Sequence, residues 1–197
     1  MRILVLGNGF DIAHDLPTRY SDFLDFVRAF KCFSAKSEYD KQYQQFFERI
    51  QGSSIYDEIL ELLGQNDRLL QYFVDIYEDR CNRGKNGWID FELEIANIVK
   101  RLETARKIVI EENEKTEPNV VLPYQVDRIV KAVLLEQKDG KGERIYYPEG
   151  FEEGRVNALV DGLNRLTRLL EIYLSEYVAF LSIRKEFQNA EKSIHMF

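Results

Sequence analysis

The chain has 197 residues, of which 34 are acidic and 27 are lysine or arginine, so its formal net charge is −7. With 45% hydrophobic and 13% aromatic residues it can bury a core, which excludes disorder along the whole chain. The acidic balance argues against a broad nucleic-acid surface, and no apolar run reaches the ~20 residues that span a bilayer. Cys32 and Cys81 are isolated, so no disulfide framework or metal site is indicated. We expect a cytoplasmic protein without membrane contact.

The first element in chain order is a short apolar run at 3–6, which ends at a glycine pair. A continuous apolar run of this length is typical of a buried strand in a parallel sheet. The later elements are predicted to be helices because their apolar residues recur at helical spacing, and Ser21 is the predicted N-cap of the first. The predicted helices are Tyr20–Phe33, Ser54–Leu63, Asp67–Tyr77, Trp88–Ile110 and Val156–Phe187.

A turn-rich segment at 138–143 allows a hairpin near 133–147. Its arms would be 133–135 and 145–147, although the first arm fits a helix equally well.

The strand predicted at 3–6 needs a partner, because buried backbone N–H and C=O groups do not stay unpaired. The candidates are 145–147, 120–122, Ile194–Phe197 or another chain, and the last makes a homo-oligomer worth testing. The predicted fold class is α/β, with a Rossmann-like N-terminal β-loop-α unit and a predominantly helical remainder. We predict one domain over 1–197, with the nucleotide-loop unit at 1–35 and the helical part at 36–197.

The segment that carries chemistry is Gly-Asn-Gly-Phe-Asp at 7–11. Glycines let the backbone approach a phosphate closely, and N–H groups of a following helix turn can point at the anion. A simple strand-to-helix turn explains the glycines as well, because Ile12 stands where the dinucleotide fingerprint has its third glycine. The predicted nucleotide-binding residues are Gly7, Asn8, Gly9, Phe10, Asp11 and Tyr20.

Three polar residues are the catalytic candidates. Asn8 and Asp11 would bind ribose or the attacking water, and His14 would be a general base. Each has a structural alternative: Asn8 as a left-handed turn residue, Asp11 as a helix cap, and His14 as an exposed or structural histidine. Asp90 and Glu92 are interpreted as acidic residues at a helix N-terminus, since positions i and i+2 do not share a helix face.

Two stretches resemble the AbiH family, bacterial proteins linked to abortive infection, in which an infected cell stops supporting phage growth. The first combines the 7–11 motif with Leu-Pro-Thr at 16–18, Tyr20 and Ser-Asp-Phe-Leu at 21–24. The second is Trp-Ile-Asp-Phe-Glu at 88–92. The resemblance covers roughly the first hundred residues and implies a phage-defence protein.

The opening is also similar in spacing to the nucleotide loop of sirtuins, which implies NAD or another adenine nucleotide as the ligand. Asp11 replaces a serine, Asp15 replaces a glycine, and Tyr20 stands where an arginine is usual. An aspartate at position 11 would repel a phosphate unless it faces ribose hydroxyls or a metal.

The C-terminal part departs from the family pattern. Longer AbiH members continue into a strand with a Phe-Asn-Tyr-like segment and a later His-Gly, and neither precedes Phe197 here. Three hypotheses remain open: a phage-defence protein that binds and hydrolyses NAD or a related nucleotide, a non-catalytic sensor or interaction module, and a truncated family member. The sequence does not identify the trigger or the target.

Overall fold

The computed structural model of the chain describes residues 16–64, 68–83, 90–115, 120–134 and 148–184. Within these ranges the secondary structure is helical, and no β-strand occurs there. The prediction of an α/β fold with a Rossmann-like unit is therefore wrong, because the part of the chain that the structure describes is all-helical. The predicted strand at 3–6 and the second hairpin arm at 145–147 lie outside the described residues.

The helices predicted from apolar spacing are confirmed, with shifted ends. An amphipathic stripe buries itself by packing against other helices, so no sheet is needed to cover it. The observed counterparts are α2 (Tyr20–Ser34), α4 (Ser54–Leu62), α5 (Arg68–Asn82), α6 (Phe91–Asn113) and α8 (Pro148–Ile172). Val133 and Leu134 end α7 (Tyr124–Leu134), so the helical alternative for the first hairpin arm is the correct one at these two residues.

The chain divides into two compact units. Unit 1 comprises residues 1–63 and 167–197, and unit 2 comprises residues 64–166. Besides α2, α4 and the end of α8, unit 1 contains the short helix η1 (Lys41–Tyr43), α3 (Gln44–Ile50) and the π-helix η3 (Tyr173–Val178).

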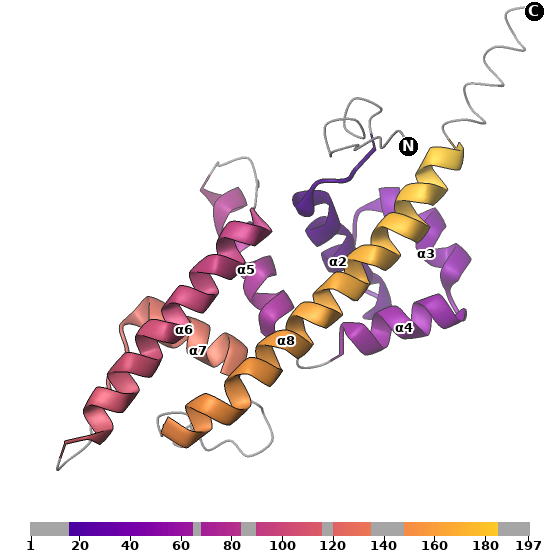
Figure 1. Cartoon of the computed structure of the whole chain (residues 1–197). Coiled ribbons are helices and arrows are strands. Elements are labelled where there is room, and N and C mark those ends of the chain that lie inside the picture. The colour runs from indigo at the N-terminus through magenta and orange to yellow at the C-terminus, as the bar shows by residue number, and fades with distance from the viewer. Residues whose placement is uncertain (1–15, 65–67, 84–89, 116–119, 135–147, 185–197) are drawn as a thin grey trace, which may run out of the picture. The chain divides into compact units, whose positions relative to one another are not determined.

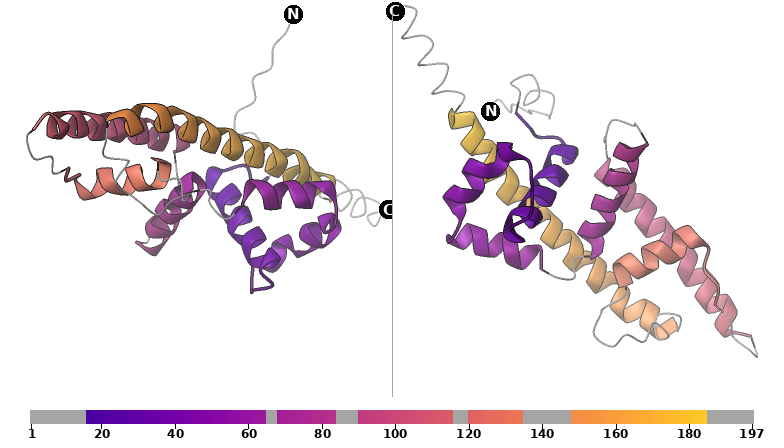
Figure 2. Two further views of the ribbon diagram at one scale, coloured as in Figure 1. Left: turned by 90° about the horizontal axis from the view of Figure 1, so that it is seen from below. Right: turned by 180° about the vertical axis from the view of Figure 1, so that it is seen from behind.

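Aromatic side chains build the core of unit 1. Phe26 of α2 lies at the centre of it, with its ring centroid 5.1 Å from that of Tyr173 and 5.4 Å from that of Phe47. Phe23 and Phe30 are fully buried beside it. Figure 2 shows α2, α3 and α4 gathered along the C-terminal end of the long helix. Rings of this size bury enough apolar surface to hold short helices that would be marginal alone.

Two local features fix the course of α4. Gly52 has φ +79°, a left-handed conformation that favours glycine, and it lies in the turn after α3. Ser53 caps α4, because its Oγ accepts a hydrogen bond from the backbone N–H of Tyr56 at 3.4 Å. Farther along α4, Glu58 accepts two hydrogen bonds from Arg168, at 2.7 and 3.2 Å, which join α4 to the end of α8.

Unit 2 is built from α5, α6, α7 and the first part of α8. In Figure 1, α6 and α7 lie side by side, in agreement with their contacts. The rings of Phe73 in α5 and Phe91 in α6 are 4.5 Å apart between centroids. Gly162 of α8 packs so closely that an added Cβ would be 3.0 Å from Leu69 Cδ2. The missing side chain of this glycine therefore sets the approach of α8 to α5.

No helix in the described ranges is long and apolar enough to cross a membrane.

Candidate functional site

Most of the predicted site residues precede position 16, where the described part of the chain begins. Outside the described residues lie Gly7, Asn8, Gly9, Phe10, Asp11 and His14. Of the predicted nucleotide-binding residues, Tyr20 is described: it is the first residue of α2 and its side chain is half-buried. The described part of the candidate site is therefore the segment that follows the glycine motif in sequence, from residue 16 onward.

That segment is anchored to the C-terminal part of unit 1. The Tyr173 hydroxyl donates a hydrogen bond to the backbone carbonyl of Pro17. The N–H of Thr18 donates to the carbonyl of Leu16 at 3.0 Å, which forms a tight turn ahead of α2. The Leu-Pro-Thr part of the family-like motif is thereby held at a defined place on the π-helix.

Thr18 carries a buried polar atom. Its Oγ1 is shielded from solvent and has no hydrogen-bond partner among the described residues. A buried hydroxyl without a partner costs roughly 1–3 kcal/mol, so such groups are uncommon and call for an explanation. The atom lies directly after the anchored Pro17, at the exit of the glycine loop.

The start of α2 differs from the sequence prediction. The N-cap residue is Arg19 and not Ser21. Asp22 reaches back, and its Oδ2 accepts a hydrogen bond from the Arg19 N–H at 3.0 Å. Burial raises the pKa of Asp22, although that hydrogen bond acts in the opposite direction. Asp22 therefore holds its proton more strongly than an exposed aspartate does.

Three buried tyrosines surround this region: Tyr43, Tyr173 and Tyr177. Burial is the main cause that raises the pKa of each of them, and it brings the pKa of Tyr177 to about 12. The negative charge of Asp22 adds to the effect on all three. Burial in the core of unit 1 therefore keeps these three phenols protonated at a higher pH than exposed tyrosines.

The sequence missed the roles of Tyr173 and Thr18. Tyr173 falls within the helix predicted over Val156–Phe187, but helical spacing does not show which residue its hydroxyl contacts. A π-helix, which is frequent at functional sites, covers Tyr173 and Tyr177 and had no recognisable sequence signal.

The second acidic motif has a structural role. Asp90 is the N-cap of α6, and its Oδ1 accepts from the N–H of Leu93 at 3.0 Å. Glu92 is exposed in the first turn, so the interpretation of these residues as a helix N-terminus is confirmed. Glu94 instead forms an ion pair with Arg80 of α5.

The described residues contain no group of three or more histidines, cysteines or acidic residues arranged to hold a metal ion.

One family comparison identifies the chain. The sequence model of the family described as Bacteriophage abortive infection AbiH matches residues 3–196. The chain belongs to the AbiH family. The match includes the glycine loop, the Leu-Pro-Thr segment and the long C-terminal helix, so the resemblance seen in the first hundred residues extends over almost the whole sequence. No curated protein matches this AbiH chain, and no solved structure matches it.

Proposed function

We propose that this AbiH protein acts in phage abortive infection, in the cytoplasm, by binding NAD or a related adenine nucleotide at residues 7–11. The observation that carries the proposal is the Gly-Asn-Gly-Phe-Asp motif, which lies inside the family match. Gly7 and Gly9 would let the backbone approach the ligand, because neither has a side chain in the way. Phe10 and Tyr20 would flank the adenine base.

The anchored segment after the loop supports this proposal. A binding loop loses less conformational entropy on binding when its ends are already held. The hydrogen bond from Tyr173 to Pro17 holds the C-terminal end of the loop against the π-helix. The unpartnered Thr18 hydroxyl is a ready donor or acceptor at the same place, and a ribose hydroxyl would satisfy it.

The charges near the loop favour ribose recognition. Asp11 is acidic, and Asp22 and Asp25 lie close enough to the buried tyrosines to influence their pKa values. Carboxylates accept hydrogen bonds from ribose hydroxyls but repel phosphates. We therefore expect Mg²⁺ to strengthen the binding of the phosphate-bearing ligands and to matter little for adenosine.

Hydrolysis of NAD would proceed by attack of water on the anomeric carbon of the nicotinamide ribose. The bond between that carbon and the nicotinamide nitrogen breaks, and nicotinamide leaves with the bonding electrons. Asn8 and Asp11 would position the water, and His14 would accept its proton. The products are ADP-ribose and nicotinamide.

Binding is tested by calorimetric titration of the pure protein with NAD, ADP-ribose, AMP and ATP, with and without Mg²⁺. Saturable binding that is lost in Gly9→Val, with an unchanged circular dichroism spectrum, supports a nucleotide site at the loop. If none of the ligands binds the wild-type protein, the proposal is wrong.

Turnover is tested by chromatography of NAD after incubation with the protein. Release of nicotinamide that disappears in Asp11→Ala supports hydrolysis. Asp57→Ala, an exposed aspartate on α4, is the matched control and should retain the activity. Binding without turnover would favour the second hypothesis, a nucleotide sensor that does not catalyse.

A further inference from the structure

A second feature of unit 1 is a groove between α3, the start of α4 and the end of the C-terminal helix. It forms an open cavity of about 300 Å³. We call it the Phe180 groove. Its apolar lining consists of Phe46, Ile50, Ile55, Ala179, Phe180 and Ile183. Ile183 remains 54% exposed, so apolar surface at this place is left open to solvent.

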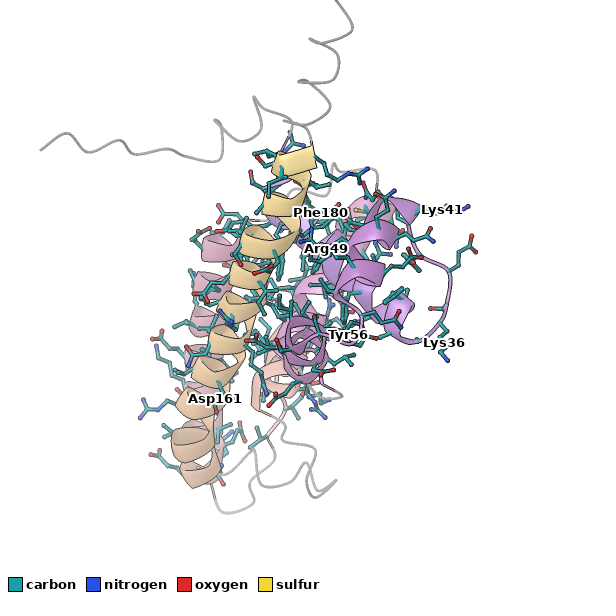
Figure 3. All side chains as sticks on the ribbon, turned by 90° about the vertical axis from the view of Figure 1, so that its right-hand side faces the viewer. Lys36, Lys41, Arg49, Tyr56, Asp161 and Phe180 are labelled. Carbon is teal, nitrogen blue, oxygen red and sulfur yellow. The ribbon has the colours of Figure 1, made fainter. Side chains whose placement is uncertain are left out.

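Two arginines flank the aromatic ring that gives the groove its name. The Arg49 guanidinium carbon lies 5.4 Å from the Phe180 ring centroid, and that of Arg184 lies 5.5 Å away. Figure 3 shows Arg49 next to Phe180. Neither arginine forms an ion pair with any residue that the structure describes, although 34 of the chain's residues are acidic.

Stacking on an aromatic ring holds a guanidinium group in a defined orientation before a ligand binds. The planar group is already oriented, so it loses little rotamer freedom when a carboxylate arrives, and it can hold that carboxylate with two hydrogen bonds. Arg49 lines the groove, and Arg184 contacts the ring of Phe180, which lines it as well, so the two favour a ligand with negative charges on either side of an apolar group.

Glu176 also lines the groove, and its negative charge favours some classes of ligand over others. Its carboxylate can accept hydrogen bonds from N–H donors, which a peptide backbone supplies and a phosphate or a free carboxylate lacks. A small anion would leave the apolar part of the groove empty and would face the charge of Glu176.

We propose that the Phe180 groove binds a short acidic peptide segment of a partner protein. One apolar side chain fills the cavity, and flanking Asp or Glu side chains pair with Arg49 and Arg184. The backbone N–H groups of the peptide donate to Glu176. This surface is independent of the nucleotide loop, and its test does not require a nucleotide.

The test uses fluorescein-labelled synthetic peptides with a central leucine flanked by Asp and Glu, acetylated and amidated at their ends. Fluorescence anisotropy with the full chain should show saturable binding that weakens with salt. Replacing the central leucine by alanine should weaken binding about tenfold or more, because the cavity loses its apolar occupant.

Charge reversal supplies the decisive variants. Arg49→Glu and Arg184→Glu should each weaken binding of the acidic peptide by about tenfold or more. A peptide with Lys in place of the flanking acids should bind Arg49→Glu better than the wild type. Lys41→Glu is the matched control: this exposed lysine lies outside the groove (Figure 3), and its reversal should leave affinity unchanged.

Three results would overturn the proposal. The first is that no acidic peptide binds, or that Arg49→Glu and Lys41→Glu bind it equally well. The second is that inorganic tripolyphosphate binds in the groove while the peptides do not, which would assign the arginines to a small anion. The third is a self-association of the wild type, seen by sedimentation, that Arg49→Glu abolishes, since the occupant would then be a second copy of the chain.

Discussion

At the scale of the residue, the Tyr173 hydroxyl connects the segment that follows the glycine motif in sequence to the C-terminal part of unit 1. It joins residues 156 positions apart in the sequence. Its ring packs edge-on against Phe23, with centroids 5.7 Å apart. The two parts of the side chain thus have separate roles, in that the ring fills the core and the hydroxyl fixes Pro17.

Tyr173→Phe separates these roles. The ring packing is kept, but the Pro17 carbonyl loses its donor, so we expect the free energy of unfolding to fall by about 1–2 kcal/mol. The measurement is the urea midpoint at neutral pH. Tyr177→Phe is the control, since no described residue forms a hydrogen bond with the Tyr177 hydroxyl. Equal losses in the two variants would contradict a role for the Tyr173 hydroxyl.

The ion pair between Arg80 and Glu94 is the second prediction at this scale. The Glu94 side chain is 11% exposed and that of Arg80 is 29% exposed. Glu94→Ala removes the carboxylate that pairs with the partly buried Arg80, so we expect a loss of about 2–3 kcal/mol of stability, less than for a fully buried pair. Glu103→Ala, an exposed position on the same helix, should change the urea midpoint little. A similar, small change in both variants would contradict the expected contribution of this ion pair.

At the scale of the element, the packing of α8 on α5 depends on Gly162. Glycine is a poor helix former, so its place inside a long helix needs a reason. The reason is the close approach of Leu69, whose Cδ2 and Cβ would lie 3.0 and 3.2 Å from an added Cβ. Contact with the fixed Cβ leaves little room for adjustment.

Gly162→Leu should therefore destabilise unit 2. We expect a loss of about 1–3 kcal/mol from overpacking, despite the better helix propensity of leucine. Asp161→Leu introduces the same residue at the neighbouring exposed position and should be tolerated. Urea unfolding of the two variants provides the comparison, and an unchanged midpoint in Gly162→Leu would mean that α8 can move away from Leu69.

At the scale of the whole molecule, the buried tyrosines make stability depend on alkaline pH. The folded state raises their pKa above the ordinary value of 10.0, so it holds protons that the unfolded chain releases. Their contribution is complete below about pH 10 and is lost as the pH rises through the folded pKa, which is about 12 for Tyr177.

We therefore expect the urea midpoint to fall steadily above about pH 10. Absorbance of ionised tyrosine should show groups that titrate only as the protein unfolds. Tyr177→Phe should weaken the alkaline dependence, whereas Tyr124→Phe, at a side chain that is 80% exposed, should not. Full titration of every tyrosine in the folded protein near pH 10 would contradict this burial.

Much of the helical structure could be predicted from the sequence, but the fold class could not. The stripe of Phe23, Phe26 and Phe30 predicts α2, because helical spacing is a local property. One apolar run at 3–6 suggested a sheet, and the described residues show helices only. A run of four apolar residues does not decide between a strand and other structures, because that choice depends on what the rest of the chain packs against it.

The candidate site was likewise only partly predictable from the sequence. The Gly-Asn-Gly-Phe-Asp motif and the AbiH resemblance could be recognised in the sequence, and the family match confirms the resemblance. The roles of Tyr173 and Thr18 could not be predicted from the sequence. They depend on burial and on a contact between residues far apart in the chain. The nucleotide and the catalytic roles of Asn8, Asp11 and His14 stay predictions.

The sequence by itself determined the helices and the family, since both follow from residue order over short or contiguous stretches. Only the tertiary structure decided that the described chain is all-helical, that Tyr173 holds Pro17, and that Arg49 and Arg184 flank Phe180. The physical reason is that these arrangements bring together groups far apart in the chain. Local spacing shows which residues will be buried, but only packing determines which of them meet.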